Sequence, residues 1–335
     1  MTQNLARTTG RSTLVVAPNW LGDAVMAVPF MRALRRARPA DSLTVLARPG
    51  PAAVFRAEGS ADGVLVARGF YTDVTALGRS RVDEAWLLPN SFRSALLLFL
   101  ARVPQRIGYA ADGRSALLTH AVRRPTGAAH QLRAYDALLA SRGIEPDTGP
   151  PRLPIPPHAG DRARRAFASA GLPGGAPLVL LAPGAAFGQT KRWPAERFAE
   201  LADHLAERGV LSGVVVGPGE ERLGEDVSRR AHHRPVVLGA DLDPIELAAL
   251  LAQARVVVAN DSGPMHLAAA VGTPVVALFG PTDPGRTAPS GAPAAILDRY
   301  VFCSPCFLRR CPYGHECMKE ITAEMALAAV EELMP

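Results

Sequence analysis

A short polar turn, residues 260–266, follows an apolar run and opens a stretch with helical spacing. The β-branched run before it predicts a central strand, and Pro264 fits the first turn of a helix capped by Ser262 or Gly263. The amides and the positive dipole end at such a helix start bind anions, typically phosphate, and His266 could add a donor. The turn therefore predicts a phosphate site, although an ordinary strand-to-helix connection has the same pattern.

Two further loops follow predicted strands in the same half of the chain, so all three are expected to converge on one ligand. Residues 183–194 offer small side chains for close backbone approach and Lys191 as a point charge for phosphate. Residues 217–222 offer two adjacent glutamates, either of which could accept a hydrogen bond from a ribose hydroxyl. Each loop alone is weak evidence, but together they favour a nucleotide-diphosphate site.

Several common motifs are absent from the sequence. There is no P-loop pattern and no Gly-x-Ser-x-Gly elbow. The nearest dinucleotide fingerprint, which starts at Gly217, has Arg222 in place of its third glycine. What remains is a two-domain transferase that binds a nucleotide-activated donor in one half and an acceptor in the other.

In the first half, Asp23 ends a turn at the carboxyl end of the first predicted strand, where open α/β sheets place their ligands. A carboxylate there could take a proton from an acceptor hydroxyl, or it could simply cap the following helix. Most of the arginines further along are expected on the solvated surface, with one or two binding an acidic acceptor. They are Arg93, Arg106, Arg114, Arg123 and Arg124.

The elements that must position these residues are short apolar strands alternating with single helices, a pattern that predicts parallel, helix-covered sheets. A helix over residues 24–38 is expected to kink or start late at Pro29. Residues 150–157 contain five prolines and predict a linker. The fold class is therefore α/β, with two Rossmann-like domains, residues 1–157 and 158–335, whose parallel sheets face a central cleft.

The composition limits the partners. A chain of 335 residues with 48% hydrophobic content and a net charge of +6 suits a globular protein that meets anionic small molecules or an anionic membrane face. Nucleic acid is the least supported partner because the arginines are scattered and aromatics are few. Residues 1–12 lack the apolar core of a signal peptide, and the apolar run 95–101 is too short to cross a bilayer. We expect a cytoplasmic protein with at most peripheral membrane contact.

Five motifs lie in order along nearly the whole chain. They are Pro-Asn-Trp-Leu-Gly-Asp-Ala-Val-Met at 18–26, Pro-Asn-Ser-Phe-Arg-Ser-Ala at 89–95, Arg-Ile-Gly-Tyr at 106–109, Pro-Gly-Ala at 183–185 with Lys-Arg-Trp-Pro at 191–194, and Asn-Asp-Ser-Gly-Pro-Met-His at 260–266. As a set they resemble the ADP-heptose lipopolysaccharide heptosyltransferases of glycosyltransferase family 9. The resemblance implies a GT-B fold and inverting transfer of L-glycero-D-manno-heptose from ADP-heptose to the heptosylated lipopolysaccharide inner core, on the cytoplasmic face of the inner membrane, with no cofactor required for catalysis.

Carried over by position, the resemblance makes Asp23 the general base and places Asn19, Arg93 and Arg106 on the acceptor side. The implied donor-binding residues lie on the three converging loops: Thr190, Lys191, Glu220, Glu221, Asp261, Ser262, Gly263 and His266. Which glutamate meets the ribose stays open. Pro264 departs from the family, where many relatives have a larger apolar residue. The alternatives are a heptosyltransferase with another acceptor and a nucleotide-sugar-binding protein without turnover.

All four cysteines lie within residues 303–317. Disulfides are disfavoured in a cytoplasmic protein, which leaves buried reduced thiols or a tetrahedral zinc site. The ligands of such a site would be Cys303, Cys306, Cys311 and Cys317, with His315 as a possible substitute. The zinc would be structural, and its removal is expected to loosen the terminal helix, residues 322–334, before it affects the donor site. This helix is expected to pack back across the domain junction.

Overall fold

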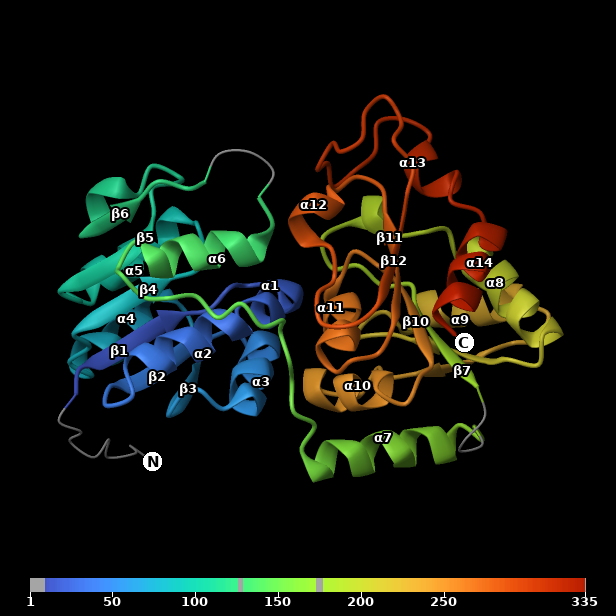
Figure 1. Cartoon of the computed structure of the whole chain (residues 1–335), viewed down its shortest axis with the longest axis horizontal. Coiled ribbons are helices and arrows are strands. Elements are labelled where there is room, and N and C mark those ends of the chain that lie inside the picture. The colour runs from blue at the N-terminus through green and yellow to red at the C-terminus, as the bar shows by residue number, and fades with distance from the viewer. Residues whose placement is uncertain (1–9, 126–128, 173–176, 335) are drawn as a thin grey trace. The chain divides into compact units, whose positions relative to one another are not determined.

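The apolar runs predicted as strands form two separate parallel sheets, one in each half of the chain (Figure 1). In this computed structural model, residues 10–125, 129–172 and 177–334 are described. The chain divides into two compact units, Met1–Gly149 (unit 1) and Pro150–Pro335 (unit 2). The division falls at the start of the proline-rich segment, whereas the expected boundary was at its end.

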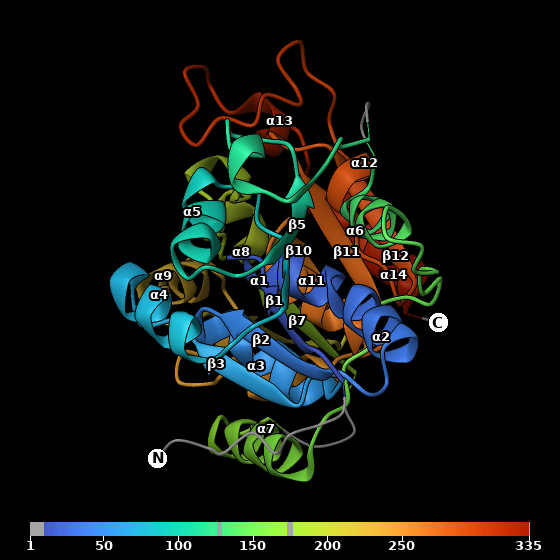
Figure 2. The ribbon, with the colours of Figure 1, turned by 90° about the vertical axis from the view of Figure 1, so that its left-hand side faces the viewer.

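The strands of unit 1 form a six-stranded parallel sheet in the order β3-β2-β1-β4-β5-β6. They are β1 (Ser12–Val16), β2 (Ser42–Ala47), β3 (Gly63–Val66), β4 (Glu84–Leu87), β5 (Gln105–Tyr109) and β6 (His120–Val122). The helices are α1 (Leu21–Met26), α2 (Val28–Ala37), α3 (Pro49–Glu58), α4 (Phe70–Arg79), α5 (Phe92–Leu100) and α6 (Gln131–Ala140). Figure 2 shows α4 and α5 on one side of the sheet and α2 and α6 on the other. The strand order reverses between β1 and β4, so the loops that leave these two strands flank the position where doubly wound sheets bind ligands.

Unit 2 repeats this plan with the order β12-β11-β10-β7-β8-β9. Its strands are β7 (Leu178–Ala182), β8 (Leu211–Val215), β9 (Val236–Leu238), β10 (Val256–Asn260), β11 (Val275–Phe279) and β12 (Ala294–Asp298). Its helices are α7 (Pro157–Ser169), α8 (Ala195–Glu207), α9 (Glu221–Arg230), α10 (Pro244–Leu251), α11 (Gly263–Ala270), α12 (Pro284–Thr287), α13 (Glu316–Lys319) and α14 (Ala323–Leu333). Every residue of β7, β10 and β11 is buried, as central parallel strands require. The order reverses between β7 and β10, which are hydrogen-bonded neighbours.

Two helical segments can be compared directly with the sequence predictions. The helix expected over 24–38 is two helices, because α1 ends at Met26 and α2 restarts at Val28 with Pro29 in its first turn, where a proline loses no intrahelical bond. The terminal helix α14 has its main contacts with α8 and with strands β10, β11 and β12 of its own unit. Among the described residues, no helix is both long enough and apolar enough to span a bilayer.

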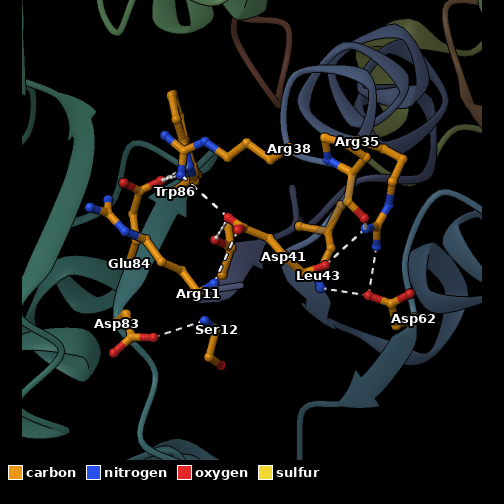
Figure 3. Close-up of polar contacts among 12 residues, drawn as sticks. Arg11, Ser12, Arg35, Arg38, Asp41, Leu43, Asp62, Asp83, Glu84 and Trp86 are labelled. Carbon is orange, nitrogen blue, oxygen red and sulfur yellow. Dashed lines mark hydrogen bonds and ion pairs between the residues drawn. The ribbon is translucent and has the colours of Figure 1, made fainter. Parts of the chain in front are cut away.

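A polar network closes the edge of the unit 1 sheet where the strands begin (Figure 3). Glu84, the first residue of β4, is fully buried, and its Oε1 accepts hydrogen bonds from Trp86 Nε1 at 2.7 Å and from Arg38. Arg38 also lies 3.8 Å from the Asp41 carboxylate, which accepts from the Arg11 amide at 3.1 Å. A buried carboxylate is costly without hydrogen-bond partners, so these contacts give the edge a structural role. Asn19 and Asp23 lie at the opposite edge, where β1 ends.

Candidate functional site

The loops that leave β7 and β10 are joined at the switch point of unit 2 by one buried asparagine. Asn260, the last residue of β10, accepts from the Trp193 amide at 3.0 Å and donates from Nδ2 to the Pro183 carbonyl at 2.8 Å. Trp193 is itself buried and donates from Nε1 to the Ile321 carbonyl at 2.9 Å. The 183–194 loop is therefore held near both of its ends, which gives the residues between them a defined position.

Lys191 and Asp261, expected on separate loops of one site, form an ion pair there. Lys191 Nζ donates to Asp261 Oδ2 at 2.6 Å and to the Asp261 carbonyl at 3.2 Å. Thr282, which follows β11, donates from Oγ1 to the same carboxylate oxygen at 2.7 Å. The ammonium has three N–H donors, so it can donate to one more acceptor while it stays paired. Thr282 is a site residue that the sequence analysis missed, and its place just after a strand was the only signal for it.

The start of α11 lies directly beside this pair. Ser262 is the N-cap residue in an extended conformation, and its side chain makes no capping bond. Its buried Oγ has no hydrogen-bond partner within the described part of the chain. Of the two residues expected at the N-cap, Ser262 occupies that position, and Pro264 lies in the first turn as expected, while His266 lies one turn further on and is buried. The first amides of a helix lack intrahelical acceptors, so these amides and the remaining N–H of Lys191 can donate to an anion, although the Asp261 carboxylate offsets the charge of the lysine.

The two candidate glutamates have different surroundings. The Glu220 carboxylate packs against Gly184, where a Cβ would come within 2.0 Å of its Oε2, and Oε2 accepts from the Gly217 amide at 3.3 Å. Glu221 instead begins α9 and accepts from the Gly219 amide at 3.2 Å. Hydrogen bonds from the backbone amides of Glu221 and Gly219 lower the pKa of the exposed Glu221 carboxyl. Glu220 also lies 3.6 Å from the Arg192 guanidinium, so it contacts the 183–194 loop at two residues.

In unit 1, Asp23 lies in the first turn of α1, just after β1. The N-cap residue is Trp20, so the alternative that Asp23 is the helix cap is wrong. The Asp23 carbonyl lies 3.5 Å from the hydroxyl of Tyr135 on α6. Burial, and then the nearby charge of Asp23, raise the pKa of Tyr135 well above its ordinary value. Tyr135 is thus a neutral, buried neighbour of the candidate base, and the sequence analysis missed it.

The three predicted acceptor residues are not all brought together. Asn19 is exposed between β1 and α1, near Asp23. Arg93 is exposed on α5, with its guanidinium 4.6 Å from the centre of the Phe70 ring. Arg106 lies near the start of β5, towards the opposite edge of the sheet, and its guanidinium donates to the Val103 and Leu117 carbonyls at 2.6 Å each. Desolvation lowers the pKa of Arg106.

Arg114 belongs to the group of arginines of which most were expected on the solvated surface, but it is fully buried. It donates from Nη1 to the Pro89 carbonyl at 2.5 Å and to Ser94 Oγ at 3.1 Å, and from Nε to the Tyr109 carbonyl at 2.9 Å. Burial lowers the pKa of Arg114 to about 10. The guanidinium satisfies an irregular loop that would otherwise lack donors, and so shapes the segment after β4 that flanks the switch point.

The cysteine-rich segment, residues 303–317, lies against the 183–194 loop. All four cysteines, which fall in the described part of the chain, are free thiols. They line one cavity of about 170 Å³ together with Thr190 and His315: Cys303, Cys306, Cys311 and Cys317. Burial first, and then the other three thiols, raise the pKa of Cys317 to about 11. In residues 10–125, 129–172 and 177–334, no three His, Cys, Asp or Glu side chains are grouped so as to hold a metal ion.

Two Rossmann-like units, one with a carboxylate at its switch point and the other with a lysine and a helix start at its own, have the GT-B architecture found in glycosyltransferases. The profile described as glycosyltransferase family 9 (heptosyltransferase) matches residues 74–316. The chain belongs to this family, which confirms the predicted resemblance and fold, and it is a glycosyltransferase.

Individual relatives agree with this assignment. The chain is 30% identical over 342 residues to lipooligosaccharide heptosyltransferase 2 of Haemophilus influenzae, covering 96% of this chain and 99% of the relative. It is 30% identical over 308 residues to lipopolysaccharide heptosyltransferase 2 of Escherichia coli K12, covering 85% and 87%. The solved structure of the E. coli ADP-heptose LPS heptosyltransferase II is similar to it with a TM-score of 0.81, at 24% identity and with 96% and 98% of the two chains covered.

Proposed function

We propose that the protein transfers L-glycero-D-manno-heptose from ADP-heptose to the heptosylated inner core of lipopolysaccharide, with inversion at the anomeric carbon. The observation that carries the proposal is the Lys191–Asp261–Thr282 cluster beside the start of α11, because it places a fixed cation and free helix amides at one switch point. Relatives matched over most of the chain are named heptosyltransferase 2, which supports this acceptor class.

In the proposed reaction, the bond between the anomeric carbon and the diphosphate breaks while an acceptor oxygen attacks. The leaving ADP gains negative charge, and Lys191 and the amides of Ser262 and Gly263 stabilise that charge. Asp23 accepts the proton of the acceptor hydroxyl as the new bond forms. Glu220 accepts a hydrogen bond from the adenosine ribose, since it is the glutamate in contact with the 183–194 loop. None of these steps requires a metal ion.

The test is ADP release from ADP-heptose, measured with and without a heptosylated core acceptor. We expect release only when the acceptor is present. Equal release with an acceptor that lacks heptose would indicate another acceptor, and tight ADP binding without release under any condition would indicate a binding protein.

We further propose that the protein is cytoplasmic and contacts the inner membrane peripherally. Residues 299–313 support this, because they contain exposed aromatics, including Tyr300, Phe302 and Tyr313, and three arginines but no acidic residue. Aromatic rings and arginines bind the interface of anionic bilayers. We predict that Phe302→Ser lowers co-sedimentation with phosphatidylglycerol vesicles several-fold, whereas Tyr71→Ser, which changes an exposed aromatic of unit 1, has little effect. Equal sedimentation of the two variants and the wild type would contradict the proposal.

We also propose that the four cysteines bind a structural zinc ion. The support is that all four free thiols line one cavity, because thiolates are preferred tetrahedral ligands of zinc. The thiols would have to move closer together on binding, since no three of them are grouped as metal ligands in the described structure. We predict about one zinc per chain in protein purified under reducing conditions without chelator, with the thiols protected from titration until the metal is removed. Zinc far below this ratio, with every thiol titrating in the native protein, would reject the site.

A further inference from the structure

We propose that His315 is a positioning residue of the donor site: the hydrogen bond between its imidazole and Thr190 holds Lys191 in place, and residues 303–317 thereby form a wall of that site. This inference rests on the proposed function, because it assigns a role in binding the ADP part of the donor.

The backbone carbonyl and the side-chain hydroxyl of Thr190 both form hydrogen bonds with the cysteine-rich segment. His315 Nε2 lies 2.6 Å from the Thr190 carbonyl, which makes this nitrogen the N–H donor. Thr190 Oγ1 in turn donates to the Leu308 carbonyl at 2.6 Å. Thr190 is buried and immediately precedes Lys191. The cysteine-rich segment, more than a hundred residues away in sequence, therefore fixes the backbone position from which the Lys191 side chain extends.

The same segment also holds the loop after β11. The Phe307 amide donates to the Pro281 carbonyl at 2.8 Å, and Ser304 Oγ donates to the Gly280 carbonyl at 2.5 Å. These carbonyls directly precede Thr282, which binds the Asp261 carboxylate. The cysteine-rich segment thus binds the loop that carries Lys191 and the loop that carries Thr282, two of the three loops that meet at the Lys191–Asp261 pair, and it does so directly, without α14 as an intermediate.

The backbone of His315 indicates that its imidazole matters. His315 has φ +66° and ψ +33°, the left-handed region in which glycine is favoured over residues with a Cβ. A histidine there has a conformational cost that a glycine would not have, and its hydrogen bond to Thr190 is a compensating contact. The 183–194 loop and the cysteine-rich segment also pack closely at Gly188, where a Cβ would lie 2.9 Å from the Arg309 carbonyl oxygen.

Loss of this bond should affect donor binding more than bond cleavage. Lys191 would keep its partner Asp261, but the short 3-10 turn Gln189–Lys191 would lose the contact that fixes its position. The ammonium would then meet the diphosphate less often in the right geometry. Proton transfer at Asp23 in unit 1 would not change.

The experiment compares the wild type with His315→Gly and His315→Gln. Glycine suits the left-handed backbone but removes the donor, while glutamine keeps a terminal N–H at similar reach. We expect His315→Gly to weaken ADP binding in calorimetry by about five- to tenfold, which is the effect of one lost hydrogen bond. We expect KM for ADP-heptose to rise by the same factor, while kcat stays within about twofold of the wild-type value. We expect His315→Gln to restore most of the affinity.

A second variant changes the contact between the two segments on the side of the 183–194 loop. Gly188 has an extended backbone (φ 161°), so Gly188→Ala adds only the close approach to Arg309, and we expect it to weaken ADP binding in the same way. Wild-type affinity in His315→Gly, or no recovery in His315→Gln, would overturn the inference while ADP binding by the wild type still stood. Failure of the wild type to bind ADP would overturn the proposed function and this inference with it.

Discussion

Asp23→Asn is expected to lower heptosyl transfer by about 10²–10⁴-fold while ADP binding and folding are retained. Asparagine has nearly the shape of aspartate but cannot accept a proton from the acceptor hydroxyl. Because the N-cap of α1 is Trp20, the substitution removes no helix cap. A loss of turnover without a loss of stability would therefore show that the Asp23 carboxylate acts as a base.

The measurements are kcat, ADP affinity by calorimetry, and thermal unfolding. Asp73→Asn is a matched control, since Asp73 also lies in the first turn of a unit 1 helix and accepts from the amides of Arg68 and Gly69. We expect this control to lower stability and leave kcat unchanged. If Asp23→Asn transfers heptose within a few-fold of the wild type, Asp23 is not the base.

Lys191→Ala is expected to lower kcat/KM by about 10²–10³-fold and to weaken ADP binding clearly. The lysine is one of only two in a chain with 37 basic residues, and it lies where a compact point charge faces the start of α11. Removing the lysine also leaves the buried Asp261 carboxylate with Thr282 but without a cation. Repulsion between this carboxylate and the diphosphate then adds to the lost attraction between Lys191 and the diphosphate.

Calorimetry with ADP and with UDP measures this effect, with Lys319→Ala as the control because Lys319 is the other lysine and is exposed on α13. We expect ADP affinity to fall only in Lys191→Ala and UDP to bind the wild type poorly. Unchanged ADP binding in Lys191→Ala, or equal affinity of the wild type for UDP-sugars, would contradict the donor assignment.

Much of this architecture could be predicted from the sequence because it depends on local patterns. Short apolar runs alternating with helices predict parallel sheets, and parallel strands bring the loops at their carboxyl ends to one edge. Lys191 and Asp261 could therefore be assigned to one site before their 2.6 Å contact was known. The restart of the helix at Val28 likewise follows from Pro29, whose missing N–H acts within a single turn.

Only the tertiary structure decided which polar residues serve these loops from a distance. In sequence, Arg114 resembles the exposed arginines around it, yet it is buried because irregular backbone at the end of β4 requires donors. Thr282 and His315 likewise contact Asp261 and Thr190, which lie on other loops. Hydrophobic spacing predicts which face of a strand or helix is buried, but a hydrogen bond between distant segments depends on where two loops meet after the sheets have formed, and no local pattern records that.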